Sequence, residues 1–123
     1  VADYKPKKIS GTKIKKTDST LQLELEQTKD ILASLGKIKQ KQVLVGFALE
    51  TNDELQNAIK KLKSKNLDLI VLNSLNDEGA GFGGSTNKVT MIDKNEHITN
   101  YSLKSKTEVA QDLMNEILKL LDA

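Results

Sequence analysis

Two mainly apolar runs, at residues 43–49 and 67–72, stand near the middle of the chain, and the first of them is continuous. Runs of this length without polar alternation are typical of strands that are covered on both faces. Between them, an apolar stripe at helical spacing extends from Leu55 to Leu62. A strand, a helix and a strand of these lengths predict that the two strands pair in parallel through a right-handed connection.

Local signals predict the ends of the helix between these runs. Thr51 and Glu54 have the spacing of a capping box, in which a threonine and a glutamate three residues later satisfy each other's backbone N–H groups. Asn66 can adopt the left-handed conformation that ends a helix. We therefore expect the helix to extend to about Lys65.

The C-terminal third of the chain predicts a hairpin and a further helix. Apolar residues at 89–92 and 97–103 flank the turn residues 93–96, which is the pattern of an antiparallel hairpin. Ser105 and Glu108 form a second capping box. The apolar stripe of the helix that follows comprises Val109, Leu113, Ile117 and Leu120.

The N-terminal third has weaker patterns. The alternation of Leu21, Leu23 and Leu25 with polar residues predicts a half-buried strand. Asp30 can cap a short helix, which Gly36 is expected to interrupt. The apolar residues of that helix are Ile31, Leu32, Leu35 and Ile38.

The first nineteen residues are expected to be mostly irregular. Residues 10–19 are polar and lack apolar periodicity, which favours a mobile loop or flap. Pro6 cannot donate to a strand ladder, so the opening residues indicate the end of a strand that enters a loop. The chain begins at Val1 without methionine, apparently part-way through a strand, which suggests that an upstream part has been removed.

Together these elements predict an α/β fold of one domain, since 123 residues leave no room for a second. We expect a three-layer, Rossmann-like sandwich with a mostly parallel central sheet. The strands near Val89 and Ile98 would extend it as an antiparallel hairpin. Polar residues gather where the predicted strands end, and the carboxyl ends of parallel strands are where such sheets bind ligands.

Composition narrows the chemistry. The chain has no cysteine, which excludes disulfides, thiolate catalysis and cysteine-based zinc sites. His97, the single histidine, is expected to be exposed, with no partner at a spacing suited to a metal ligand or general base. No apolar run approaches the roughly 20 residues that span a bilayer, and no secretion signal is evident, so we expect a cytoplasmic protein without a membrane partner.

Positive charge is concentrated at the start of the chain. Although the formal net charge is only +2, the first sixteen residues contain six lysines against one acid, Asp3. Such clustering attracts anions. The four aromatic residues are scattered instead of interleaved with the lysines, which argues against nucleic acid and favours a smaller polyphosphate.

Several residues near the predicted strand ends have two interpretations. Lys61 and Lys65 stand one helical turn apart and could straddle adjacent phosphates, or could simply complement the helix dipole in water. Phe47 could border a base or fill the core. Glu50 and Thr51 could each bind a hydroxyl group or cap the helix.

The glycine-rich segment GAGFGGSTN, at residues 79–87, could present backbone N–H groups to an anion or be a plain surface connection. It is neither a Walker loop nor a dinucleotide fingerprint. No serine, histidine and carboxylate set or inward carboxylate pair can be assembled. If the protein is an enzyme, it works by positioning and charge stabilisation, and no catalytic residue is assigned in this fragment.

Motifs in register along nearly the whole chain resemble the phosphopantothenate–cysteine ligase family. These are VADYKP, KIKK at residues 13–16, LELEQTKDIL, VGFALET, LDLIVLN and GAGFGGSTNKVTMID. The family is the carboxy-terminal enzyme of a bacterial bifunctional coenzyme A flavoprotein, whose amino-terminal partner is phosphopantothenoylcysteine decarboxylase. Lys29 departs from the proline usual in the family's turn, and Asn73-Ser74 replaces a common Asn-Asp pair.

The resemblance implies a reaction and its partners. CTP, with magnesium, activates the carboxylate of 4′-phosphopantothenate as an acyl cytidylate, and cysteine displaces CMP to form the amide. FMN belongs only to the decarboxylase part. Carried over by position, the nucleotide contacts fall on Asp3, Lys13, Thr28, Lys29, Asp30, Ile31, Phe47, Lys61 and Lys65. The resemblance leaves open which residues bind the metal.

The resemblance also implies that residues 1–123 are the distal half of a ligase domain. Family members carry an upstream glycine-rich half, with an asparagine that stabilises the acyl cytidylate, which this chain does not contain. The isolated chain is therefore expected to be inactive, and the parent to be a homodimer fused to a decarboxylase. A second hypothesis is a noncatalytic nucleotide-binding or dimerisation module.

Overall fold

The computed structural model describes residues 2–16, 20–74, 76 and 83–122. The chain divides into two compact units, Val1–Ile31 and Leu32–Ala123. The elements that the sequence predicts lie within one unit or the other, except the helix that begins at Ile31, which crosses the boundary. Each unit is described separately below.

The N-terminal unit contains a two-stranded antiparallel ribbon. β1 (Tyr4–Pro6) pairs with β2 (Leu25–Gln27), and the ion pairs Lys5–Glu26 and Lys7–Glu24 join the strands at 3.4 and 3.0 Å. Residues 10–16 form no helix or strand and are exposed, while residues 17–19 of the predicted flap lie outside the described part. The basic segment is thus carried on an exposed ribbon.

The predicted half-buried strand at Leu21, Leu23 and Leu25 is wrong. Only Leu25 lies in a strand, and the three side chains are 53–70% exposed. A two-stranded ribbon has no second layer of its own to cover an apolar face, so the alternation in the sequence is not matched by burial within this chain.

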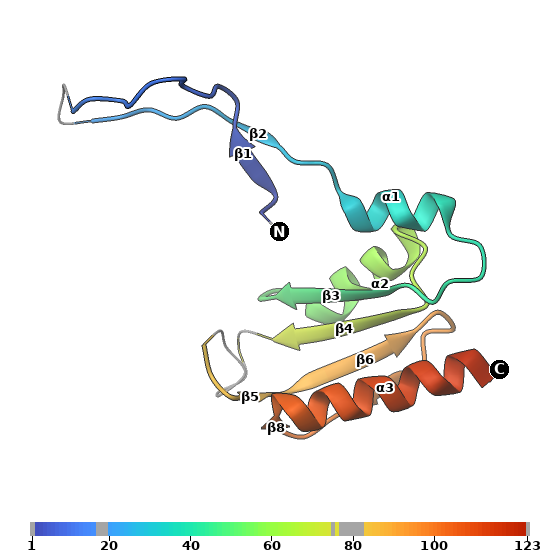
Figure 1. Cartoon of the computed structure of the whole chain (residues 1–123). Coiled ribbons are helices and arrows are strands. Elements are labelled where there is room, and N and C mark those ends of the chain that lie inside the picture. The colour runs from blue at the N-terminus through green and yellow to red at the C-terminus, as the bar shows by residue number, and fades with distance from the viewer. Residues whose placement is uncertain (1, 17–19, 75, 77–82, 123) are drawn as a thin grey trace. The chain divides into compact units, whose positions relative to one another are not determined.

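The C-terminal unit is built on a four-stranded mixed sheet of order β3-β4-β6-β7 (Figure 1). These strands are β3 (Val45–Glu50), β4 (Leu69–Ser74), β6 (Val89–Asp93) and β7 (Ile98–Asn100). β3 and β4 are parallel from Val45↔Leu69 to Glu50↔Ser74, which confirms the pairing of the two apolar runs. The β6–β7 hairpin is confirmed as well.

The mostly parallel central sheet predicted from the sequence is wrong. β4 pairs with β6 antiparallel, so only the β3–β4 pairing of the described sheet is parallel, and β3 lies at its edge. No helix is described between β4 and β6, and a parallel return would need such a crossover. A short antiparallel pair, β5 (Thr86–Asn87) with β8 (Lys104–Ser105), lies beside the start of the last helix.

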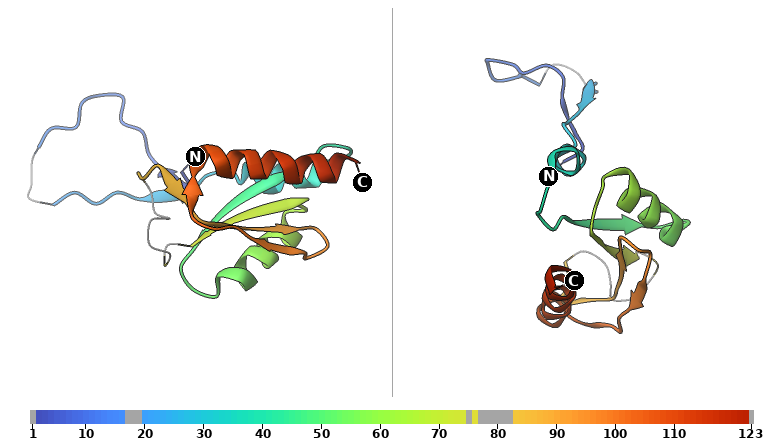
Figure 2. Two further views of the ribbon diagram at one scale, coloured as in Figure 1. Left: turned by 90° about the horizontal axis from the view of Figure 1, so that it is seen from below. Right: turned by 90° about the vertical axis from the view of Figure 1, so that its right-hand side faces the viewer.

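Helices cover both faces of this sheet, which gives the three layers that the sequence predicts (Figures 1 and 2). α1 (Ile31–Ile38) contributes Leu32 and α2 (Glu54–Ser64) contributes Ala58 and Leu62 to one core, with alternate residues of β3 and β4. α3 (Lys106–Asp122) packs its predicted stripe against the opposite face, where Val71 and Met91 are fully buried.

Gly36 does not interrupt α1. It lies inside the helix and is buried, and a Cβ at this position would stand 1.9 Å from the carbonyl oxygen of Lys65. The Asn66 side chain donates to the Gly36 carbonyl at 2.9 Å. The glycine therefore permits the close approach of α1 to the C-terminal end of α2.

The two capping boxes have different outcomes. Ser105 and Glu108 form theirs: the Ser105 N–H donates to the Glu108 carboxylate at 2.9 Å, and the Glu108 N–H donates to the Ser105 hydroxyl at 3.2 Å. The Thr51–Glu54 box is wrong, because α2 begins after Asp53, a left-handed residue whose side chain makes no cap hydrogen bond. Asn66 has the predicted left-handed conformation after α2, with φ of 54°.

Candidate functional site

An ammonium–carboxylate pair lies at the carboxyl end of β3. The Lys61 ammonium donates to a carboxylate oxygen of Glu50, the last residue of β3. The Glu50 side chain is only 13% exposed, whereas that of Lys61 is 44% exposed. Side chains of a helix lean toward its N-terminus, and the N-terminus of α2 faces the carboxyl ends of the strands, so Lys61 reaches back to the ligand-binding edge of the sheet.

A second polar group adjoins this pair on the same side of the sheet. Glu54 accepts hydrogen bonds from the Ser74 hydroxyl at 2.6 Å and from the Asn76 side chain at 2.8 Å. The Asn76 side chain also donates to the Thr51 carbonyl at 2.7 Å. These bonds fasten the start of α2 to the carboxyl end of β4, and they explain why Glu54 is not available to a capping box.

Lys61 and Lys65 have different surroundings. Lys65 follows α2 as its C-terminal cap, and its backbone N–H donates to the Lys61 carbonyl at 3.1 Å. Its own carbonyl faces Gly36 of α1. The two lysines are one turn apart as predicted, and Lys61 is paired with the Glu50 carboxylate at the end of β3.

Phe47 is not a core residue, since its side chain is 65% exposed. It is paired in register with Val71, which belongs to the core beneath α3, while its neighbour Ala48 belongs to the core beneath α2. Because successive residues of a strand point to opposite faces, the Phe47 ring lies on the opposite face from Glu50 and Lys61. The ring and the ammonium thus flank the same edge strand.

The remaining predicted contacts lie in the N-terminal unit. Thr28 meets the start of the chain there: its N–H donates to the Asp3 carbonyl at 2.9 Å and its hydroxyl to the Ala2 carbonyl at 2.7 Å. Ile31, at the first turn of α1, is 53% exposed. Lys13, Lys29 and Asp30 are exposed as well. The structure thus brings Asp3 and Thr28 together within this unit.

Sequence reasoning missed two features of the strand ends. One is the role of Glu54 as partner of Ser74 and Asn76. The other is Asn73, whose side-chain oxygen is buried and has no hydrogen-bond partner. The signal for both was the change from apolar to polar residues at the end of the run LIVLNS, which places polar side chains at the carboxyl end of a buried strand. Residues 77–82, which include Gly79 and Gly81, lie outside the described residues.

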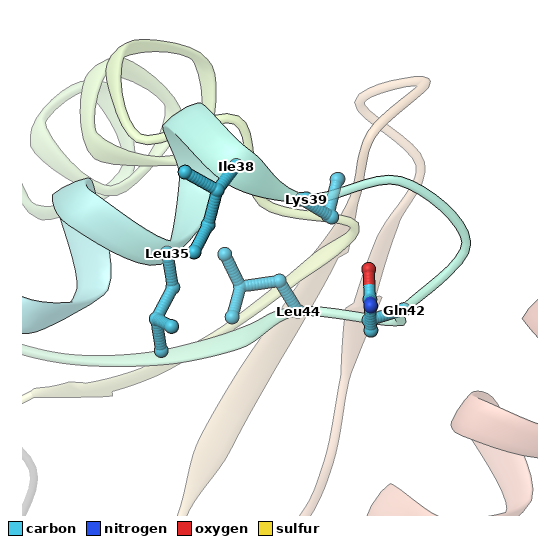
Figure 3. Close-up of a pocket in the computed structure, with 5 residues that line it drawn as sticks. All are labelled: Leu35, Ile38, Lys39, Gln42 and Leu44. Carbon is cyan, nitrogen blue, oxygen red and sulfur yellow. The ribbon is translucent and has the colours of Figure 1, made fainter.

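A cavity of about 240 Å³ lies at the other end of the sheet, where the chain passes from α1 into β3 (Figure 3). Leu35, Ile38 and Leu44 form its apolar lining, with Lys39 and Gln42 beside them. Nearby, the Lys39 ammonium binds the Asp68 carboxylate at 3.0 Å and the Asn66 carbonyl at 2.7 Å. These contacts join the α1–β3 connection to the α2–β4 connection, at the opposite end of β3 from Glu50.

His97 is exposed, as predicted, and the structure places a carboxylate beside its ring. Its Nδ1 lies 2.9 Å from a carboxylate oxygen of Asp93, four residues earlier in the β6–β7 turn. Burial alone would raise the pKa of Asp93, but hydrogen bonds from His97 and Asn95 outweigh it and lower the pKa. Elsewhere, burial and the hydrogen bond to Glu116 raise the pKa of Tyr101 to about 12.

The described residues contain no helix that is long and apolar enough to cross a bilayer. The fold and the site define a mixed α/β domain with an ammonium group and an exposed ring at the edge of a parallel strand pair. The sequence profile described as the DNA/pantothenate metabolism flavoprotein C-terminal domain matches residues 1–121, and the chain belongs to that family.

Three relatives illustrate the likeness. The chain is 55% identical over 122 residues to a "Cysteine/Cysteine sulfinic acid decarboxylase" from an unknown prokaryotic organism, covering 98% of the chain and 34% of that protein. It is 48% identical over 120 residues to the "Coenzyme A biosynthesis bifunctional protein CoaBC" of Bacillus subtilis (strain 168), covering 98% of the chain and 30% of that protein. The chain therefore spans about a third of the length of these relatives.

A solved structure, the C-terminal domain of a coenzyme A biosynthesis bifunctional protein CoaBC, matches 99% of the chain and 51% of its own length. The two are 38% identical, with a TM-score of 0.76. The described fold thus corresponds to about half of that domain.

Proposed function

We propose that the chain forms the distal half of a phosphopantothenate–cysteine ligase domain in coenzyme A biosynthesis. In this reaction CTP activates the carboxylate of 4′-phosphopantothenate as an acyl cytidylate with loss of pyrophosphate. The amine of cysteine then displaces CMP and forms the amide. The observation that carries the proposal is the likeness of nearly the whole chain to the solved C-terminal domain of CoaBC.

In this proposal the nucleotide binds along β3, the edge strand of the described sheet. Phe47 exposes its ring on one face and Lys61 extends its ammonium to the strand end on the other. An exposed ring can border a base, and a lysine can bind phosphate oxygens as a mobile point charge. Lys65, one turn further along, supplies a second cation for the triphosphate.

The proposal also assigns nucleotide contacts to residues within the N-terminal unit. The hydrogen bonds from Thr28 to the backbone of Ala2 and Asp3 hold the turn at residues 28–31 against the chain start, so that Asp3, Lys29, Asp30 and Ile31 act as one group. Lys13 adds a cation from the lysine-rich segment. An exposed basic ribbon of this kind raises the local concentration of a polyanion such as CTP.

Magnesium would accompany CTP through its phosphates. No three histidine, cysteine or acidic side chains gather within the described ranges where they could hold a metal ion. Mg²⁺ in nucleotide sites is commonly held by phosphates, water and one or two carboxylates, so the residues present fit an ion that arrives with the nucleotide. FMN would belong to the decarboxylase part of the parent protein.

The chemistry would depend on positioning and on stabilisation of developing negative charge, because no residue of this half is assigned to covalent or acid/base catalysis. The upstream half would supply the asparagine that stabilises the acyl cytidylate. The parent would be a cytoplasmic homodimer with a decarboxylase fused upstream. The word "bifunctional" in the name of the Bacillus subtilis relative supports such a fusion.

A noncatalytic nucleotide-binding or dimerisation module is the second candidate. Two observations favour it. The cations and the exposed ring at β3 could bind a nucleotide, and no catalytic group is assigned in this half. The name of the relative that is a decarboxylase describes a protein of which this chain covers only 34%. That activity is therefore not transferred to the residues of this half.

The test uses the full-length protein with CTP, 4′-phosphopantothenate and cysteine. A ligase should release pyrophosphate only with CTP and phosphopantothenate together, and should release CMP and amide product only after cysteine is added. Replacing CTP with ATP is the control for nucleotide choice. Binding of CTP without pyrophosphate release would support the noncatalytic module and contradict the ligase.

A further inference from the structure

We propose that Glu50 is a positioning residue that holds the Lys61 ammonium in place for the phosphates of the nucleotide. The inference rests on the proposed function and adds to it a residue that touches no substrate itself. It starts from the carboxylate of Glu50, which is 13% exposed and is bound to Lys61 of the proposed nucleotide set.

The location of Glu50 is fixed by β3. Its register partner is Ser74, at the end of β4, and its side chain lies on the face covered by α2, two residues after Ala48 in the core. A carboxylate that is 13% exposed is costly to leave without a cation. Lys61 supplies that cation from the last turn of α2.

The backbone of Lys61 is fixed by the core, while its side chain stays partly exposed. Leu62, the next residue, is buried in the core and anchors this turn of α2, while the Lys61 side chain remains 44% exposed. An ammonium group has three N–H donors. One is used by Glu50, which leaves two for phosphate oxygens of a ligand.

The carboxylate changes how lysine binds an anion. A free lysine side chain has many rotamers, and this freedom is lost when the side chain is fixed on a phosphate. A lysine that Glu50 already holds has lost part of that freedom before the ligand arrives, so binding costs less. The Glu50 carboxylate repels the phosphates to some extent, but it also holds the Lys61 ammonium in place to bind them.

A matched pair on the same helix provides the control. Lys63 binds Glu96 in the β6–β7 turn, but these side chains are 62% and 45% exposed, as in an ordinary surface ion pair. Neither residue belongs to the proposed nucleotide set. Glu96→Gln therefore breaks a lysine–glutamate pair of α2 without touching the site.

The experiment is a double-mutant cycle in the full-length protein with Glu50→Gln, Lys61→Met and both together. Glu50→Gln should raise the KM for CTP about three- to tenfold, the size of a partial loss of the lysine's preorganisation, and leave the KM for cysteine unchanged. In the Lys61→Met background, Glu50→Gln should add nothing, because Glu50 acts through Lys61. Glu96→Gln should change neither KM.

An unchanged KM for CTP in Glu50→Gln would overturn the role of Glu50, whether or not the thermal midpoint of that variant falls. The role would also be overturned if Glu50→Gln raised this KM by the same factor with and without Lys61. A lower KM for CTP would mean that Glu50 repels the nucleotide instead of presenting the lysine. Wild-type protein that neither binds CTP nor forms product removes the proposed function and this inference together. Active wild type with an unaffected Glu50→Gln removes the inference alone.

Discussion

Lys61 and Lys65 stand one helical turn apart in the sequence, yet their surroundings differ. Lys61 is bound to the nearly buried Glu50, whereas the backbone of Lys65 caps α2 next to Gly36. Spacing alone predicts two equivalent cations on one helix face. The structure instead predicts that the two residues contribute differently to stability even if both bind the nucleotide.

Replacing either lysine with alanine should weaken CTP use by about 1–3 kcal/mol, and both losses should shrink at high salt. Lys61→Ala should also lower the thermal midpoint more than Lys65→Ala does, because it leaves the Glu50 carboxylate without its cation. Steady-state kinetics with varied CTP and thermal unfolding of each full-length variant provide the test. Unaltered kinetic constants in both variants would mean that the two lysines only lie in water on the helix surface and do not bind CTP.

The turn between β6 and β7 gives a prediction for acid pH. The pKa of Asp93 is lowered from 3.8 in the folded protein, so its ionised form stabilises the turn fully at neutral pH. That contribution is lost as pH falls through the folded pKa, below about 4. Asp93→Asn should therefore lower the thermal midpoint at pH 7 and differ less from wild type at pH 3. If the thermal midpoints of wild type and Asp93→Asn differ by the same amount from pH 7 to pH 3, the ionised Asp93 carboxylate does not stabilise the turn.

At the scale of elements, close contacts and caps decide which local patterns matter. α1 reaches the end of α2 only because Gly36 has no side chain there. α3 begins with a complete capping box at Ser105, whereas α2 begins at a left-handed Asp53 without a side-chain cap. Of the two capping boxes that the same spacing predicts, the one at Ser105 forms and the one at Thr51 does not.

Gly36→Ala should destabilise the protein by about 1–3 kcal/mol, the range for overpacking. The added methyl group would meet a backbone carbonyl, which cannot move aside as a flexible side chain can. This outweighs the gain of up to about 1 kcal/mol that alanine normally gives in a helix. Gly11→Ala is the control, since nothing lies within 4 Å of its added Cβ. Equal thermal midpoints for the two variants would contradict the close contact.

Ser105→Ala should cost about 1 kcal/mol, the usual value for a lost N-terminal cap. Thr51→Ala should stay within about 0.5 kcal/mol, because α2 does not use Thr51 as a cap. Chemical denaturation of both variants gives the comparison. A larger loss for Thr51→Ala than for Ser105→Ala would show that α2 is capped in the way that the sequence alone suggests.

At the scale of the whole molecule, the sheet leaves β3 at an edge with Phe47 exposed, and the ribbon leaves its leucines exposed. A family relative of known structure is about twice as long as this chain. Both facts agree with the proposal that this half works together with an upstream half. Since positioning would be the main catalytic resource, separating the halves should remove activity while leaving the local fold of β3, β4 and α2 intact.

The isolated 123-residue chain should therefore form no phosphopantothenoylcysteine from CTP, 4′-phosphopantothenate and cysteine. The full-length protein, assayed in parallel, should form it. Circular dichroism of the isolated chain serves as the control for folding. Turnover by the folded chain at a rate near that of the full-length protein would contradict the proposed division of labour.

The sequence determined the elements whose signals are local. The parallel pairing of β3 and β4, the β6–β7 hairpin, the stripe of α3 and the left-handed Asn66 all follow from hydrophobic periodicity and from the preferences of single residues. These features hold because the same residues that favour the local conformation also form the core. The motifs shared with the ligase family were visible in the same way.

Only the tertiary structure decided which polar groups meet. Glu50 and Lys61 are eleven residues apart, and Glu54 and Ser74 are twenty apart, so their pairing depends on how α2 lies on the sheet. The antiparallel entry of β6, the exposed ring of Phe47 and the tolerance of Gly36 within α1 likewise depend on neighbours distant in sequence. Periodicity specifies which face of an element is apolar, but the partner of a buried charge is fixed only when the elements pack.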